Sequence, residues 1–287
     1  MLGPFLGVLF DGFAYGMLLF LLSVGLSVTL GMMNFVNLAH CSFAMLGGYV
    51  TVTLMDRLGW PFFATLPVAF LAAAAASLVL ERLLFRPLYR ASDLDQCLLT
   101  IGIVFISVAA AAYVYGTVQQ PVRLPDYLRG SLTFMGITFA VYRLFLVGAA
   151  LLITGLLVVA LDATRFGAQV RAAVDNQRMA RGLGIDVDGA FAIAFALGSG
   201  LAGLGGALAI EIVGLDPAFA FTYLVYVLIV VSVGGLASIG GSFAAATLLG
   251  ISDVAGKYYI PQLGAFLIYL VMVGLLMWRP AGLFGRR

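Results

Sequence analysis

Charged side chains are scarce in this sequence: they make up 10% of its 287 residues, whereas 63% are hydrophobic. A soluble globular domain carries about a quarter charged residues. The shortage therefore excludes a water-soluble enzyme or binding domain, and it predicts a protein that crosses a membrane several times. The net charge of +2 is also too small to suggest a nucleic-acid-binding protein.

Residues that build metal centres are equally few. The chain has one histidine, His40, and two cysteines, Cys41 and Cys97, which lie in or beside apolar runs. One histidine and two weakly ligating cysteines, without a nearby carboxylate pair, do not make a convincing coordination shell. We therefore expect no metal site, and two buried thiols instead of a disulfide.

Motifs for energy-yielding chemistry are missing as well. Gly256-Lys257 is followed by tyrosine, and no glycine stands at position 251, so this is not a phosphate-binding loop. No HExxH or GxSxG motif occurs. We expect no catalytic residues and no cofactor bound by this chain. If it moves a solute uphill, the energy must come from an ion gradient or from a separate ATPase.

Long hydrophobic runs, by contrast, fill most of the sequence. A helix needs roughly 20 apolar residues to cross a bilayer. The runs predict an all-α fold, a polytopic transmembrane bundle of about eight to nine membrane segments, within one domain spanning residues 1–287. They cover about residues 5–30, 36–55, 61–81, 96–116, 138–161, 188–212, 220–235, 239–256 and 261–279. The glycine-rich joint at 234–241 is either a tight turn between spans or part of a broken, re-entrant helix.

Residues 162–188, here called the charged segment, interrupt the apolar runs. Its pattern predicts one helix over about 167–183, with Asp162 or Thr164 as N-cap and Gly182 or Gly184 at its end. Small apolar side chains share this helix with polar ones: Ala172, Ala173, Met179 and Ala180 with Arg171, Asp175, Arg178 and Arg181. Such a helix either docks into a groove on a partner protein or lies on anionic lipid headgroups.

Lys and Arg gather in three segments. Loop 82–95 carries three, the charged segment four and the C-terminal tail three, which leaves five elsewhere. Because cytoplasmic loops are enriched in Lys and Arg, these segments are predicted to face the cytoplasm and the N-terminus to face outside. Segment 117–137 is predicted as an external loop, since Pro121, Pro125 and Gly130 interrupt any helix.

The run 195–209 contains two overlapping rows of small residues. One consists of Gly198, Ala202 and Gly206, and the other of Ser199, Gly203 and Ala207. Small residues let helix backbones approach closely in lipid. This helix is therefore predicted to be central and to contact neighbours on two faces. The same glycines also suit a surface that slides during a conformational cycle.

Polar residues cluster where the second span should begin. On a helix, Asn34, Asn37 and Cys41 would share a face with His40 at its edge. Three roles are compatible with this block: bonding helix ends together, lining or gating a substrate path, or relaying protons, although His40 has no obvious acidic partner. Asp253 and Lys257, four residues apart near an outer span end, are predicted to form a surface pair.

Four blocks of the sequence occur in the same order and with the same spacing as in one known protein family. They are Gly31…Asn34…Asn37-Leu38-Ala39-His40 with Met45-Leu46-Gly47; Arg171-Ala172, Ala180 and Leu183-Gly184-Ile185-Asp186; Gly234-Gly235-Leu236…Ser238-Ile239…Gly241; and Arg279-Pro280…Gly282-Leu283-Phe284-Gly285. Together they cover almost the whole chain. In this combination the sequence resembles LivH-type permeases, the membrane subunits of branched-chain amino acid ABC importers. Cys41 departs from the pattern, because family members typically carry glycine there.

The resemblance implies a multi-pass permease of a bacterial plasma (inner) membrane and a set of partners. These are a second, related permease subunit forming a heterodimer, two cytoplasmic ATPases that use ATP and Mg²⁺, and an external solute-binding protein. Its cargo would be branched-chain amino acids or a related small polar solute; sister systems carry urea, short amides or aromatic acids. A self-sufficient secondary transporter and a passive channel are the rival interpretations. The first would need acidic ion sites at mid-membrane, and no acid stands deep in a confidently predicted span.

The resemblance also assigns candidate sites. The substrate path would involve Asn34, Asn37, His40, Cys41, Gly234, Gly235 and Ser238. Coupling to the ATPase would involve Arg171, Ala172, Ala173, Arg178, Met179, Arg181 and Gly184. Within the second set, we predict that Ala172, Ala173 and Met179 touch the partner, with Arg178 at the rim. The charged segment has Arg171-Ala172-Ala173 where many other importers carry a Glu-Ala-Ala motif.

Overall fold

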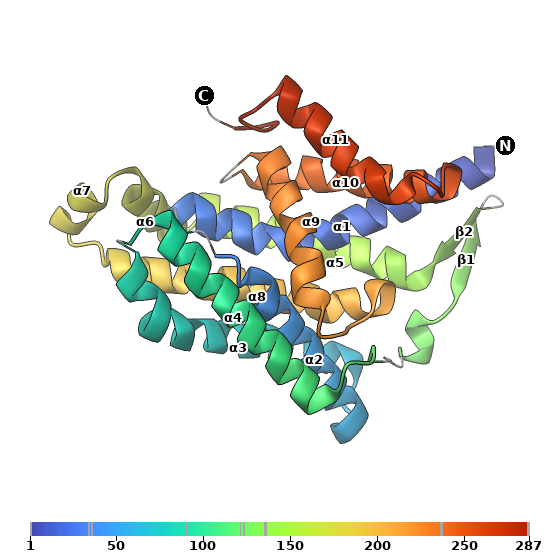
Figure 1. Ribbon diagram of the computed structural model, residues 1–287, viewed down its shortest axis with the longest axis horizontal. Helices are drawn as coiled ribbons and strands as arrows, with labels where there is room; N and C mark the ends of the chain where they lie inside the picture. Colours follow the sequence, from blue (N-terminus) through green and yellow to red (C-terminus); the bar gives the residue numbers. More distant parts are fainter. Residues whose placement is uncertain are drawn as a thin grey trace.

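The computed structural model of the protein describes residues 2–33, 35, 37–89, 91–120, 122, 124–134, 137–235 and 238–285. The chain folds into α-helices packed side by side in an elongated bundle (Figure 1). The long helices are α1 (Leu2–Met33), α2 (His40–Leu58), α3 (Phe62–Leu80), α4 (Asp93–Tyr115), α5 (Val141–Asp162), α8 (Val187–Val213), α9 (Phe219–Gly234), α10 (Ile239–Tyr259) and α11 (Gly264–Trp278). The short elements are η1 (Glu81–Phe85), η2 (Arg86–Leu88), η3 (Asp126–Leu128), β1 (Ser131–Phe134), β2 (Ile137–Ala140), α6 (Arg165–Asp175) and α7 (Gln177–Gly182).

The predicted all-α, multi-pass membrane fold is confirmed. Within the described ranges, six helices are long and apolar enough to cross a membrane, and α9 and the end of α11 add two shorter apolar helices. The helix α2 is less apolar, because it carries residues such as His40, Thr51 and Asp56. Much of α2 is buried by its neighbours, so few of its polar side chains have to meet lipid.

The helices α1 and α8 form the centre of the bundle, and small residues set how closely they pack. Side chains at Gly25 and Gly198 are excluded, because each Cβ would collide with the other residue's backbone. On α8, Gly206 lies against the backbone of Ala44 in α2, and Gly203 lies against Ala73 in α3. The predicted role of the two small-residue rows is therefore confirmed: α8 is central and meets different neighbours on different faces.

The same kind of contact joins α1 to α10. Gly16 lies against Ala246 and Gly250, and Gly12 lies against Ile251, with no room for a Cβ at either glycine. A buried hydrogen bond of 2.6 Å between the hydroxyls of Ser27 and Ser242 links the same two helices. In lipid, close backbone contact and hydrogen bonds replace the hydrophobic effect as the main attraction between helices.

At the glycine-rich joint between α9 and α10, the Ser238 amide donates to the Gly235 carbonyl at 3.2 Å, which brings the ends of the two helices close together; residues 236 and 237 lie outside the described residues. Ser238 caps α10 by accepting a hydrogen bond from the Gly241 amide at 3.0 Å. The C-terminal segment folds back on the joint, where the Leu283 amide donates to the Val233 carbonyl at 2.7 Å. Gly235 has φ +95°, and a Cβ there would lie 2.6 Å from the Gly285 nitrogen, so this contact requires glycine.

The segment predicted as an external loop contains a β-hairpin. The strands β1 and β2 pair antiparallel, with Ser131 opposite Ala140 and Phe134 opposite Ile137. The prediction of an irregular loop missed the hairpin because the segment is short and has only a brief β-branched and aromatic run. In Figure 1 the hairpin lies at one end of the bundle and α6–α7 at the opposite end. The predicted orientation requires this separation of external and cytoplasmic segments.

Candidate coupling surface and translocation path

The charged segment forms two helices, so the prediction of one continuous helix over 167–183 is wrong. The chain is extended at Asn176, with φ −155° and ψ 95°, which ends α6 and starts α7. The Asn176 side chain accepts a hydrogen bond from the Met179 amide at 3.0 Å and so caps α7. Thr164 caps α6 by accepting from the Gly167 amide at 3.2 Å. Gly184 follows α7 with φ +82°, a conformation that favours glycine.

One face of the charged segment packs against the membrane helices. Ala173 and Ala180 are buried and form a small core with Ile185, Val187 and Phe191. Ala173 therefore does not lie on the surface that a partner can reach, and its predicted contact with an ATPase needs correction. The sequence pattern failed here because a small apolar residue suits an internal helix contact as well as an external one.

The exposed apolar side chains of the segment are larger. Val174 is 41% exposed, Met179 67% and Leu183 80%, and Arg178 is exposed beside them in sequence. Ala172 is half-buried. Large exposed apolar side chains on a polar segment are typical of a protein-binding surface. Met179 and Arg178 thus remain available for docking, and Val174 and Leu183 are additions that sequence analysis did not select.

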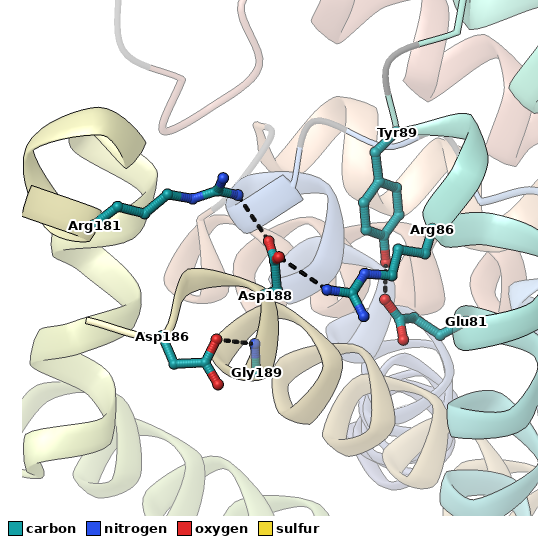
Figure 2. Close-up of polar contacts among 7 residues, drawn as sticks. All are labelled: Glu81, Arg86, Tyr89, Arg181, Asp186, Asp188 and Gly189. Carbon is teal, nitrogen blue, oxygen red and sulfur yellow. Dashed lines mark hydrogen bonds and ion pairs between the residues drawn. The ribbon is translucent and has the colours of Figure 1, made fainter. Parts of the chain in front are cut away.

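Asp188, at the start of α8, ties the charged segment to the end of α3 (Figure 2). Its carboxylate accepts hydrogen bonds from Arg181 in α7 at 2.7 Å and from Arg86 in η2 at 2.9 Å. These side chains are about half exposed, so solvent screens both ion pairs and each adds little to the stability of the fold. Their effect is to fix the position of α7. Arg181 was predicted from the sequence, whereas Arg86 and Asp188 were not, because no local pattern pairs two residues that lie 102 positions apart.

A second polar contact stiffens the end of α3 beside this cluster. The Tyr89 hydroxyl donates to Glu81 at 2.8 Å, and the neighbouring Asp186 accepts from the Gly189 amide at 3.0 Å to cap α8 (Figure 2). Burial first, and then the hydrogen bond to Glu81, raise the pKa of Tyr89 above its ordinary value. Tyr89 therefore stays protonated and keeps donating throughout the physiological pH range.

A cavity of about 530 Å³ lies between the charged segment and the membrane helices. The α6 residues Arg171 and Val174 line one side of it, and Ser27 of α1 and Ser238 of the α9–α10 joint line another. Arg171 also donates to the Leu161 carbonyl and lies 3.7 Å from the Asp162 carboxylate. The structure thus brings together residues predicted for coupling and for the path. Gly234 and Gly235, by contrast, are buried against α10 and the C-terminal segment.

The polar block before α2 lies deep in the bundle. The helix begins only at His40, so the predicted helix face shared by Asn34, Asn37 and Cys41 is wrong: Asn37 belongs to the preceding turn, and Asn34 lies outside the described residues. His40 Nε2 lies 3.0 Å from the Leu22 carbonyl of α1, to which it donates. Asn37, His40 and Cys41 are fully buried. Among the described residues the Asn37 side-chain amide has no hydrogen-bond partner.

The predicted surface pair of Asp253 and Lys257 is only half at the surface. The Lys257 side chain is 51% exposed, but the Asp253 side chain is 1% exposed, and their charged atoms are 2.6 Å apart. The spacing fixed the pairing correctly, whereas the burial of Asp253 depends on helices that are distant in sequence. Asp253 is therefore a buried acid near the outer end of α10, where a surface position had been predicted. No group of three or more potential metal ligands gathers among the described residues.

Comparison of the sequence with known families shows which family the chain belongs to. A family model described as a branched-chain amino acid transport system permease component matches residues 8–276. The chain belongs to this family. The permease is 29% identical to a probable branched-chain amino acid transport permease protein LivH from Methanocaldococcus jannaschii, over 94% of this chain and 90% of the relative. It is 25% identical to the permease protein BraD of Pseudomonas aeruginosa and 26% identical to LivH of Escherichia coli K12, both called high-affinity branched-chain amino acid transport system permease proteins. Each of these two alignments covers 98% of this chain and 96% of the relative. No solved structure matches the chain.

Proposed function

We propose that this chain is the membrane-spanning permease subunit of an ABC importer that moves branched-chain amino acids across the plasma (inner) membrane. The observation that carries the proposal is the charged segment: two short helices held between α5 and α8, with large apolar side chains exposed. A lone channel has no need of such a surface. The substrate class is inferred from the family and from the names of the relatives.

The proposed importer contains more than this chain. Two ATPase subunits bind ATP and Mg²⁺ on the cytoplasmic side, a second, related permease completes the membrane part as a heterodimer, and an external binding protein delivers the solute. The permease itself binds no cofactor and catalyses no reaction. Family membership supports ATPase and binding-protein partners in general; the heterodimer and the number of each subunit are our proposal.

The charged segment is suited to transmit movement from an ATPase to the membrane helices. Asp188 ties α7 to η2, so a push on α7 is passed to the ends of both α3 and α8. The helix α6 contacts α8, α5 and α1 and lines the 530 Å³ cavity together with Ser238. A shift of α6 therefore changes the width of that cavity, at the cytoplasmic end of the proposed path.

A self-sufficient secondary transporter is the rival function. Such transporters use acidic residues inside the membrane, and the buried Asp253 near the outer end of α10 is a residue of that kind. Family membership and the exposed docking surface favour the importer. For the substrate, urea, short amides and aromatic acids are the alternatives, and ligand binding by the partner binding protein is the measurement that separates them.

The docking surface is tested by co-purification of the permease with the ATPase subunits. In Met179→Glu with Leu183→Glu, we expect retained ATPase to fall roughly tenfold or more, since a buried charge at a contact costs more than about 1.4 kcal/mol. Leu132→Glu is the matched control, because Leu132 is also an exposed apolar side chain but lies on the external hairpin. Unchanged retention in the double variant would move the docking site elsewhere. Leucine uptake that continues without ATP would disprove the importer.

A further inference from the structure

A second cavity, here called the outer cavity, opens at the end of the bundle that carries the β-hairpin. Its volume is about 320 Å³, within the range of roughly 300–1,000 Å³ typical of small-ligand sites. Its polar lining comes from four helices: Asp11 and Tyr15 of α1, Arg143 of α5, Tyr223 of α9, and Asp253 and Lys257 of α10. Ile212, Val213 and Val254 add an apolar wall.

Asp253 is the least expected residue of this cavity. One carboxylate oxygen pairs with Lys257 at 2.6 Å, but the other, Oδ1, is buried and has no hydrogen-bond partner among the described residues. A buried carboxylate oxygen without a donor is costly, and ionisable groups inside the membrane usually serve function. A cationic group of a ligand can donate a hydrogen bond to this free oxygen.

The other charged groups of the outer cavity are Arg143, Asp11 and Lys257, and each of them takes part in an ion pair. Arg143 forms an ion pair with Asp11, and both side chains are partly exposed. The guanidinium has five N–H donors, so it has capacity for a second carboxylate. Lys257 Nζ lies 5.8 Å from the centroid of the Tyr15 ring, within cation–π range. Two acids and two bases make the set neutral overall, which suits a zwitterion better than a net cation or anion.

We propose that the outer cavity binds the zwitterionic amino acid on its way into the permease, with the free oxygen of Asp253 accepting from the α-ammonium group. Arg143 and Lys257 donate to the α-carboxylate, and Ile212, Val213 and Val254 contact the aliphatic side chain. This assignment rests on the proposed function, since it requires an amino acid as cargo. It adds a recognition site within the membrane subunit for the groups that all branched-chain amino acids share.

The site is tested in the complete importer, reconstituted with its partners, by chemical labelling of Val254→Cys on a Cys97→Ser background. Saturating leucine should slow labelling several-fold, whereas 4-methylpentanoate, which is leucine without its amino group, should not. Labelling that leucine does not slow, in a complex that takes up leucine, overturns the inference.

Transport gives the second measurement. In Asp253→Asn, which keeps the side-chain shape but places an amide in the cavity, leucine uptake should fall roughly tenfold and leucine protection of Val254→Cys should disappear. Asp126→Asn is the matched control, because Asp126 is an exposed external acid in a surface ion pair. A merely structural Asp253 would leave protection intact at whatever uptake remains. If the unmutated importer takes up no branched-chain amino acid, the proposed function itself fails. Normal uptake and intact leucine protection in Asp253→Asn refute the outer cavity alone.

Discussion

Single glycines decide how closely the central helices approach. Gly206 on α8 has no space for a Cβ, because it would collide with the Ala44 carbonyl of α2, whereas a Cβ at Gly102 on α4 would meet nothing within 4 Å. The two residues are the same type in the same secondary structure, and only their neighbours differ. The sequence shows where small residues recur but not which of them touch a backbone.

This difference gives the first prediction. Gly206→Ala should destabilise the permease by about 1–3 kcal/mol through overpacking. Gly102→Ala should be neutral or stabilise by up to about 1 kcal/mol, because alanine is the better helix former. Thermal unfolding of the two variants in the same detergent measures the contrast. Equal midpoints would show that α2 and α8 are further apart than described.

Tyr89 gives a prediction that depends on pH. Its raised pKa means that folding favours the protonated hydroxyl, so this stabilisation is fully present below about pH 10 and is lost as pH rises further. Tyr89→Phe leaves the buried Glu81 without this donor, which should cost about 1–3 kcal/mol at neutral pH. The difference between wild type and variant should shrink above pH 10 in unfolding experiments. A difference that stays constant would contradict the raised pKa.

At the scale of elements, features set by the local sequence could be predicted, whereas features set by contacts between distant segments could not. The spans follow from hydropathy, because the bilayer imposes a minimum apolar length on each crossing. The break at Asn176 did not follow, since helix-forming residues stand on both sides and only the hydrogen bond that the Asn176 side chain accepts from the Met179 amide reveals it. The burial of Asp253, the start of α2 at His40 and the role of Asp188 were also missed. The burial of Asp253 and the hydrogen bond between Asp188 and Arg86 depend on elements distant in sequence.

The cluster around Asp188 gives the element-scale prediction. In Asp188→Asn both arginines lose a charged partner, so α7 is held less firmly against η2. We expect roughly two- to fivefold less leucine moved per ATP hydrolysed, in line with the modest strength of exposed pairs, while the ATPase stays bound. Asp175→Asn is the control on the same segment, since Asp175 is exposed on α6 and forms no ion pair among the described residues. Loss of ATPase binding in Asp188→Asn would instead make Asp188 part of the docking surface.

For the whole molecule, the uneven distribution of Lys and Arg predicts which end of the bundle faces the cytoplasm and which end faces outside. The charged segment and the β-hairpin lie at opposite ends (Figure 1), so one cysteine at each end tests the orientation. In right-side-out vesicles of the Cys97→Ser background, Val118→Cys should react with an impermeant thiol reagent, and Met179→Cys only after permeabilisation. Both parent side chains are well exposed. The reverse result would invert the proposed orientation and move the outer cavity to the cytoplasmic side.

The contact between α1 and α10 has a consequence for biosynthesis. During translation α1 enters the membrane long before α10 has been made, so the glycine surface at Gly12 and Gly16 waits without its partner. Helices synthesised in between have to leave this surface free or cover it reversibly. A chain that stops before α10 never completes the contact, and we expect membrane proteases to remove such fragments quickly. The contact between α1 and α10 can form only after α10, which ends at Tyr259, has been inserted into the membrane.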